Sequence, residues 1–138
     1  VTQVYKNIQR IKKQRMNSLG LKGTQVMCIY YLSIHPGGMT AADLSRITVE
    51  DKASISRILA ELEEEGYITY KTEPGRKYRA PALLTEKGRE TAVKIQQLIL
   101  QATEAGGQGL TDEEREIFYR ALFKIADNLS ALLTNLSK

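Results

Sequence analysis

The stretch from residue 51 to residue 66, DKASISRILAELEEEG, constrains the fold of this chain more than any other. Asp51 suits the N-cap of a helix, because its carboxylate can accept a hydrogen bond from a first-turn amide. Gly66 suits the position just after the last turn. Between them, apolar residues recur at intervals of three and four: Ile55, Ile58, Leu59 and Leu62. This spacing predicts an amphipathic helix with one apolar stripe.

The side of this helix that points away from the stripe is small or polar, and Arg57 is its only outward-facing long cation. Such a helix can enter a DNA major groove, where base edges present hydrogen-bond acceptors. Glutamates at positions 61 and 63–65 would be repelled by phosphates, so we expect DNA contact only in the N-terminal half. The candidate contacts there are Lys52, Ala53, Ser54, Ser56 and Arg57. Taken alone, the pattern also fits a solvated helix that packs on a core.

The segments on either side of this helix predict a winged helix-turn-helix. Thr40 and Asp43 form a capping-box pattern that starts a short helix ending near Ile47, and a three-residue connection follows. Leu44 and Ile47 are expected to pack against the apolar stripe at Ile55 and Leu59. After residue 66 the apolar period changes to two, which predicts a β-hairpin that turns at 73–76 and returns over 77–84. The proline at position 81 places the return strand at an edge or interrupts it.

The predicted hairpin carries cations at and beside its tip. A cationic wing suits the phosphate backbone or the minor groove of DNA, whose negative potential attracts arginine. The candidate wing contacts are Lys71, Arg76, Lys77 and Arg79. In the first helix of the helix-turn-helix, Thr40 and Arg46 are further candidate contacts.

Further helices are predicted at 2–17, 22–34, 86–105 and 111–136. The helix at 22–34 is apolar nearly all round and should therefore be central. The first helix and the last two carry more apolar surface than a winged domain can cover, which predicts an isologous dimer. We therefore expect a mainly α fold with a small β-hairpin wing in a single domain over 1–138. Dimerisation helices would occupy 1–20 and 86–138, and the winged helix-turn-helix 22–84.

The composition restricts the chemistry of the chain. A net charge of +4 permits an anionic partner, and one cysteine excludes an intrachain disulfide. Cys28 is interpreted as a small buried residue, and His35 as a residue that interacts with a helix C-terminus. No pattern indicates a metal site, a cofactor or catalysis, so we do not expect an enzyme. Without a membrane span or a signal pattern, we expect a cytoplasmic protein with no membrane partner.

Together, these motifs resemble the MarR family of transcriptional regulators. The matching segments are TAADL at 40–44, SISR at 54–57, LEEEGYI at 62–68 and LTEKG at 84–88. The resemblance implies a homodimer held by the first and last helices, with its recognition helices in successive major grooves of a palindromic double-stranded DNA operator. The wing departs from the family's Asp-x-Arg pattern, so whether Arg76 or Arg79 enters the minor groove stays open.

The resemblance also implies repression that is relieved by a small phenolic or lipophilic effector, or by oxidation. Its effector cleft would lie between the dimerisation helices and the winged helix. The candidate residues of this pocket are Tyr5, Tyr30, Tyr31 and His35, each of which also fits a place in the core.

Two functions from different classes follow from these observations. The first is a sequence-specific DNA-binding regulator, which the basic hairpin after the helix pair favours. The alternative is a winged-helix protein-interaction module without nucleic-acid binding, which the acidic end of the helix at 51–66 favours. A steep salt dependence of binding to random DNA is expected only for the first.

Overall fold

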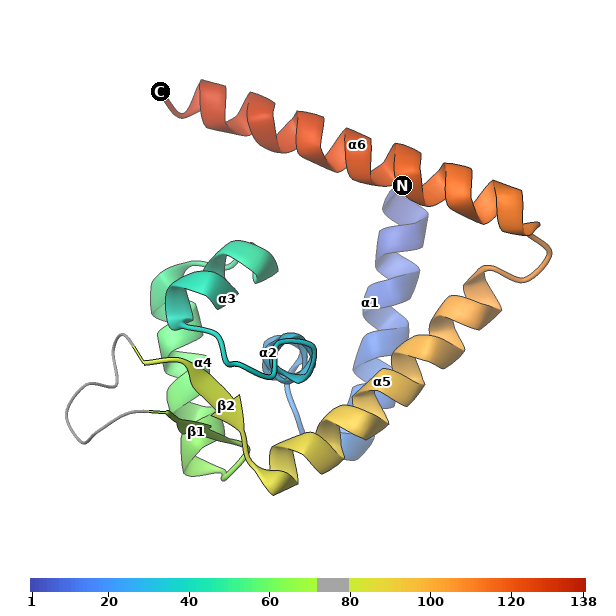
Figure 1. The fold of residues 1–138 in the computed structure, drawn as a ribbon. Helices are drawn as coiled ribbons and strands as arrows, with labels where there is room; N and C mark the ends of the chain where they lie inside the picture. The colour runs from blue at the N-terminus through green and yellow to red at the C-terminus, as the bar shows by residue number, and fades with distance from the viewer. Residues whose placement is uncertain (72–79) are drawn as a thin grey trace. The chain divides into compact units, whose positions relative to one another are not determined.

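The computed structural model describes residues 1–71 and 80–138, which divide into two compact units, Val1–Ile99 and Leu100–Lys138. The first unit begins with α1 (Thr2–Met16), a short 3-10 helix η1 (Asn17–Leu19) and α2 (Gly23–Ser33). It continues with α3 (Ala41–Thr48), α4 (Lys52–Glu64), β1 (Ile68–Tyr70), β2 (Ala82–Leu84) and most of α5 (Glu86–Gly106) (Figure 1). The end of α5 and α6 (Asp112–Leu136) belong to the second unit. The predicted turn at 73–76 lies outside the described residues.

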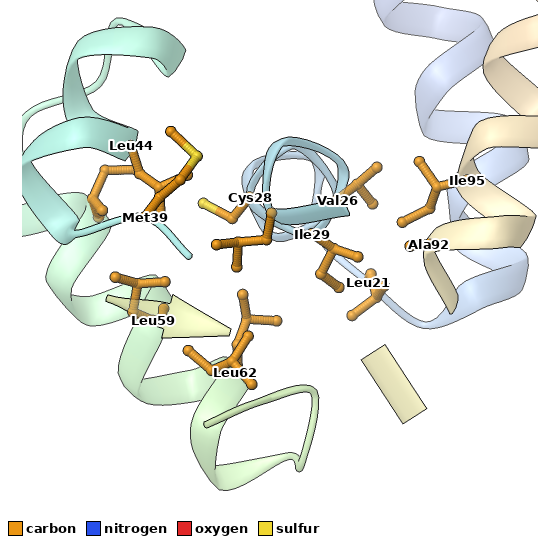
Figure 2. Close-up of a cluster of buried hydrophobic side chains, with 14 of the residues drawn as sticks. Leu21, Val26, Cys28, Ile29, Met39, Leu44, Leu59, Leu62, Ala92 and Ile95 are labelled. Carbon is orange, nitrogen blue, oxygen red and sulfur yellow. The ribbon is translucent and has the colours of Figure 1, made fainter. Parts of the chain in front are cut away.

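The centre of the core is α2, as its apolar composition predicted. Val26, Cys28 and Ile29 are fully buried. Figure 2 shows Cys28 on the side of α2 that faces Met39 and Leu44, and Val26 on the side that faces α5. Because α2 has core partners on several sides, it needs no polar face, and its sequence has little amphipathic character.

Side-chain caps fix the beginnings of α3 and α4 where the sequence predicted them. The hydroxyl of Thr40 accepts the Asp43 N–H, and the Asp43 carboxylate accepts the Thr40 N–H, both at 3.1 Å. The hydrogen bond from the Thr40 N–H lowers the pKa of Asp43. In α4, the carboxylate of Asp51 accepts the Ser54 N–H at 2.7 Å. At the other end of α4, Gly66 adopts a φ of +85°. These contacts confirm the predicted starts of both helices and the predicted end of α4.

Of the two α3 side chains that were predicted to pack on α4, Leu44 belongs to the buried core and Ile47 is partly exposed. Leu44 is buried in one cluster with Ile55 and Leu59, as expected. Ile47 is 38 % exposed, lies outside that cluster and lines an open pocket beside Met39 and Arg46. The C-cap of α3 is Val49, which adopts a left-handed φ of 58°.

The hairpin pairs β1 with β2 in antiparallel register, Ile68 opposite Leu84 and Tyr70 opposite Ala82. The strand β2 begins at the residue after Pro81, as expected for a residue that cannot donate to the ladder. Ala82 also pairs with Met39, its N–H lying 2.8 Å from the Met39 carbonyl oxygen. This bridge ties the loop before α3 to the hairpin.

The first turn of α5 is fixed to the end of α4. The Thr85 hydroxyl donates to the Gly66 carbonyl at 2.6 Å and accepts the Gly88 N–H at 3.1 Å. Lys87 donates to the Glu65 carbonyl at 2.7 Å, and its ammonium lies 4.3 Å from the ring centroid of Tyr67. We call these contacts the α4–α5 clamp. It satisfies carbonyls that the end of a helix leaves without an intrahelical partner.

Helix α6 has no buried residue, although it carries many apolar side chains. Its start is capped as predicted, because the Thr111 hydroxyl accepts the Glu114 N–H and the Glu114 carboxylate accepts the Thr111 N–H. Within the described ranges, no helix combines the length and the apolar character needed to cross a bilayer.

Candidate nucleic-acid interface

The N-terminal half of α4 presents the outer face that the sequence predicted. Lys52, Ala53, Ser56 and Arg57 are exposed and Ser54 is half-buried. The opposite side is fully covered, with Ile55, Leu59 and Leu62 at 2 % exposure or less. An Arg57 guanidinium nitrogen donates to the Ser54 hydroxyl at 3.1 Å, which turns the guanidinium towards the start of the helix. This half of α4 therefore offers cations, a hydroxyl and a methyl group to a partner.

The C-terminal half of α4 is acidic and is fixed to α2. Glu61 accepts a hydrogen bond from the Gln25 amide at 3.0 Å and lies 3.8 Å from the Lys22 ammonium. The buried Gln25 also accepts the Lys22 N–H at 2.9 Å, so its polar groups are satisfied. Glu64 and Glu65 are exposed. This end of α4 would repel phosphates, while its contacts with α2 hold the helix at a fixed angle.

The other candidate contacts fall in three places. The Thr40 hydroxyl serves as the N-cap of α3. Arg46 is exposed and forms an ion pair with Asp43. Lys71 is exposed at the residue after β1. The remaining wing candidates lie outside the described residues: Arg76, Lys77 and Arg79.

The four predicted effector residues lie in different surroundings in the single chain. Tyr5 is exposed on α1. Tyr30 and Tyr31 pack against the core with their ring centroids 5.4 Å apart in an edge-to-face arrangement, and neither lines the pocket described below. His35 lies at the end of α2, with Nδ1 2.8 Å from the Tyr31 carbonyl oxygen, which agrees with its predicted role at a helix C-terminus. Of the four candidates, His35 lines a pocket between α2, β2 and α5.

That pocket has a volume of about 430 Å³ and lies between the end of α2, β2 and the start of α5. Leu32, Leu83 and Val93 supply apolar walls, and His35, Arg89 and Gln96 supply polar groups. Arg89 donates to the Leu84 carbonyl at 3.0 Å, and Gln96 donates to the Ser33 hydroxyl at 3.0 Å. The sequence analysis missed Arg89 and Gln96, because Ser33 and Gln96 are 63 positions apart and no local pattern links them.

Cys28 is unsuited to redox chemistry in the folded chain. The side chain is fully buried, and burial, with a smaller contribution from Glu50, raises the pKa of the thiol to about 11. At neutral pH the thiol is therefore protonated and unreactive. Among the described residues, no group of three or more potential ligands is placed to hold a metal ion.

Comparisons with known proteins agree with this arrangement. The sequence model of the MarR family matches residues 19–77. A MarR family transcriptional regulator from Listeria monocytogenes, solved with a 26mer DNA, superposes with a TM-score of 0.82 at 21 % identity, covering 95 % of this chain and 89 % of that one. A MarR protein from Peptoclostridium difficile gives 0.82 at 22 % identity, covering 94 % and 84 %. The Staphylococcus aureus MepR–DNA complex gives 0.78 at 19 % identity, covering 93 % and 91 %. A search of curated proteins found no match.

The helix pair α3–α4 followed by the β1–β2 hairpin defines a winged helix-turn-helix protein. Its residues 19–77 match the sequence model of the MarR family, and the structural matches, which extend over nearly the whole chain, show that the fold is shared.

Proposed function

We propose that this chain is a transcriptional regulator that binds double-stranded DNA through the N-terminal half of α4. The observation that carries the proposal is the exposed face of Lys52, Ser56 and Arg57 on a helix whose opposite side is buried. A helix of this width fits the major groove, and recognition helices of helix-turn-helix proteins use their N-terminal residues. Two of the structurally similar proteins were solved with DNA, which supports the same assignment.

Binding to random duplex DNA at several salt concentrations tests this proposal. Log affinity should fall linearly with log salt, with a slope of about −0.9 for each phosphate that a cation neutralises. Lys52→Gln should weaken binding to all sequences alike and reduce the slope by about one contact. Lys94→Gln, at an exposed position of α5 outside the helix-turn-helix, is the matched control and should change neither quantity. Salt-independent or absent binding would favour the protein-interaction module instead.

The regulator is proposed to act as a homodimeric repressor on a palindromic operator. The apolar side chains exposed on α1 and on α6 support a dimer, since each surface is unusual for a monomeric protein. One operator half-site per subunit then follows from the two-fold symmetry.

Release of the repressor is proposed to follow the binding of a small amphipathic anion rather than oxidation. The only cysteine of the chain is buried with a raised pKa, which disfavours an oxidative switch. The pocket beside His35 has the volume of a small-molecule site, with apolar walls and the cation Arg89. A carboxylate with an apolar body would match both features.

Benzoate and its neutral analogue benzyl alcohol test the charge preference of the pocket. Benzoate should raise the Tm of the chain and weaken DNA binding, whereas benzyl alcohol should do neither. Arg89→Gln should abolish the response to benzoate. An equal response to both compounds, or an unchanged response of the variant, would contradict the assignment of Arg89.

A further inference from the structure

The structure narrows the part of α4 that is available for base recognition to its first two turns. Acidic residues begin at Glu61, which is held by Lys22 and Gln25. The remaining segment 52–57 extends about 9 Å along the helix axis at about 1.5 Å per residue. Base pairs follow one another at about 3.4 Å, so this segment faces about three base pairs of one half-site.

Within this segment, Arg57 is restrained by a neighbour that plays no part in the core. The Ser54 hydroxyl accepts a guanidinium N–H of Arg57 at 3.1 Å, while the Ser54 backbone N–H donates to Asp51 at 2.7 Å. The guanidinium is thereby held beside the first turn of α4. A fixed, planar fork of donors is the side-chain geometry that matches O6 and N7 of guanine.

The same exposed face carries one methyl group. Ala53 is exposed and lies one turn before Arg57, so the two side chains are neighbours on the helix surface. The other exposed side chains of the segment, Lys52 and Ser56, are polar. In the major groove, a small apolar side chain is complementary to the C5-methyl group of thymine.

We propose that α4 recognises a guanine and a thymine that lie within two base pairs of each other in each operator half-site. Arg57 contacts the guanine, Ser54 positions Arg57, and the Ala53 methyl contacts the thymine methyl. The inference rests on the proposed DNA-binding function, and adds which bases are recognised and by which atoms. The short spacing follows because Ala53 and Arg57 are about 6 Å apart along the axis and Ser54 draws the guanidinium back towards Ala53.

The test begins with selection of an operator from random duplexes by the full chain. In that operator, each thymine is replaced singly by deoxyuridine, which removes only the methyl group, and each guanine by 7-deazaguanine, which removes N7. Binding is then measured by fluorescence anisotropy at one salt concentration. We expect a loss of about threefold to tenfold at one thymine and at one guanine per half-site, no more than two base pairs apart.

Variants assign these losses to side chains. Ala53→Ser should abolish the penalty for deoxyuridine at the sensitive thymine. Arg57→Ala should abolish the penalty for 7-deazaguanine, and Arg57→Lys, which keeps the charge but loses the planar fork, should reduce it. Ser54→Ala should shrink the 7-deazaguanine penalty without changing the Tm, because its backbone N–H still caps to Asp51. Ala60→Ser is the matched control: it makes the same exchange on the same exposed face in the acidic half, and should leave both penalties intact.

Each of two outcomes would overturn the assignment. If Arg57→Lys or Arg57→Ala weakens the natural and the modified duplexes equally, Arg57 binds phosphate rather than guanine. If the deoxyuridine penalty survives in Ala53→Ser, another group contacts the thymine. A chain that selects no duplex and shows no salt-dependent binding would refute the DNA-binding function itself, which is a distinguishable result.

Discussion

We expect Cys28 to make the free energy of unfolding depend on pH in the alkaline range, although it has no part in the proposed site. Its pKa is raised from 9.0 to about 11, by burial first and by the charge of Glu50 second. Between these values the folded chain keeps a proton that the unfolded chain has lost, so stability falls as pH rises. The protonated thiol's contribution to the free energy of unfolding is fully present below about pH 9. It declines by about 2–3 kcal/mol as the pH rises through the folded pKa.

Urea unfolding at about pH 8 and about pH 10.5 measures this effect. The free energy of unfolding should fall more steeply with pH in the natural chain than in Cys28→Ala, which lacks the thiol. The difference between the two pH slopes of the unfolding free energy isolates the thiol. The destabilisation caused by the smaller alanine side chain does not change with pH, and the other titrating groups are the same in both chains. Identical slopes in the two chains would show that the thiol is not desolvated in the folded state.

At single positions, the sequence predicted the role of a residue correctly where that role depends only on neighbours along the chain. Thr40 and Asp51 cap their helices as predicted, because an N-cap depends only on residues two or three positions away. Val49 gave no such signal, since a β-branched residue rarely adopts a left-handed φ and nothing next to it indicates one. Arg89 also escaped notice, because its pocket forms only when α2, β2 and α5 meet.

Among the elements, the α4–α5 clamp connects the proposed recognition helix to the start of α5, and Gly88 allows the close approach. A Cβ at this position would lie 2.2 Å from the Tyr67 carbonyl oxygen, a backbone atom that cannot move aside alone. Gly88→Ala should therefore lower the free energy of unfolding by about 1–3 kcal/mol, although alanine ordinarily favours a helix by about 1 kcal/mol.

Gly23→Ala is the matched control for this exchange. Gly23 is also in the first turn of a helix of the same unit, and a Cβ there would meet nothing within 4 Å. We expect its stability to stay the same or to rise by up to about 1 kcal/mol. Urea unfolding followed by circular dichroism measures both variants. Equal effects of the two substitutions would mean that the contact at Tyr67 is not tight.

At the level of elements, the predicted order agrees with the structure because apolar periodicity is strong in this chain. The period of α4 and its change after Gly66 located the helix and the hairpin. The pairing of Met39 with Ala82 was not predicted, since a bridge between distant loops leaves no periodic pattern. The wing remains a prediction at Arg76, Lys77 and Arg79, which lie outside the described residues.

For the whole molecule, the apolar surfaces that α1 and α6 expose predict a second copy of the chain as their partner. Val4, Tyr5 and Ile8 are more than half exposed on α1. On α6 the apolar residues recur at helical spacing and are all exposed: Phe118, Leu122, Ile125, Leu129, Leu132 and Leu136. A stripe of this length that stayed in water would cost about 25 cal/mol for each Å² of apolar area left uncovered. A second copy would supply identical stripes, and two-fold symmetry would let them cover one another.

Light scattering after size exclusion should therefore give about twice the chain mass of 15.5 kDa. Leu129→Glu places a charge in the α6 stripe and should convert the dimer to a monomer, because burying an unpaired carboxylate is costly. Lys124→Glu introduces the same side chain on α6 outside the stripe and should leave the dimer intact. Since α6 has no buried residue in the single chain, neither substitution removes a core contact, and circular dichroism should stay unchanged.

A natural chain that runs at 15.5 kDa at micromolar concentration would contradict the dimer. It would also remove the reason to expect two half-sites in one operator, while leaving the recognition of bases by α4 to be tested on a single half-site.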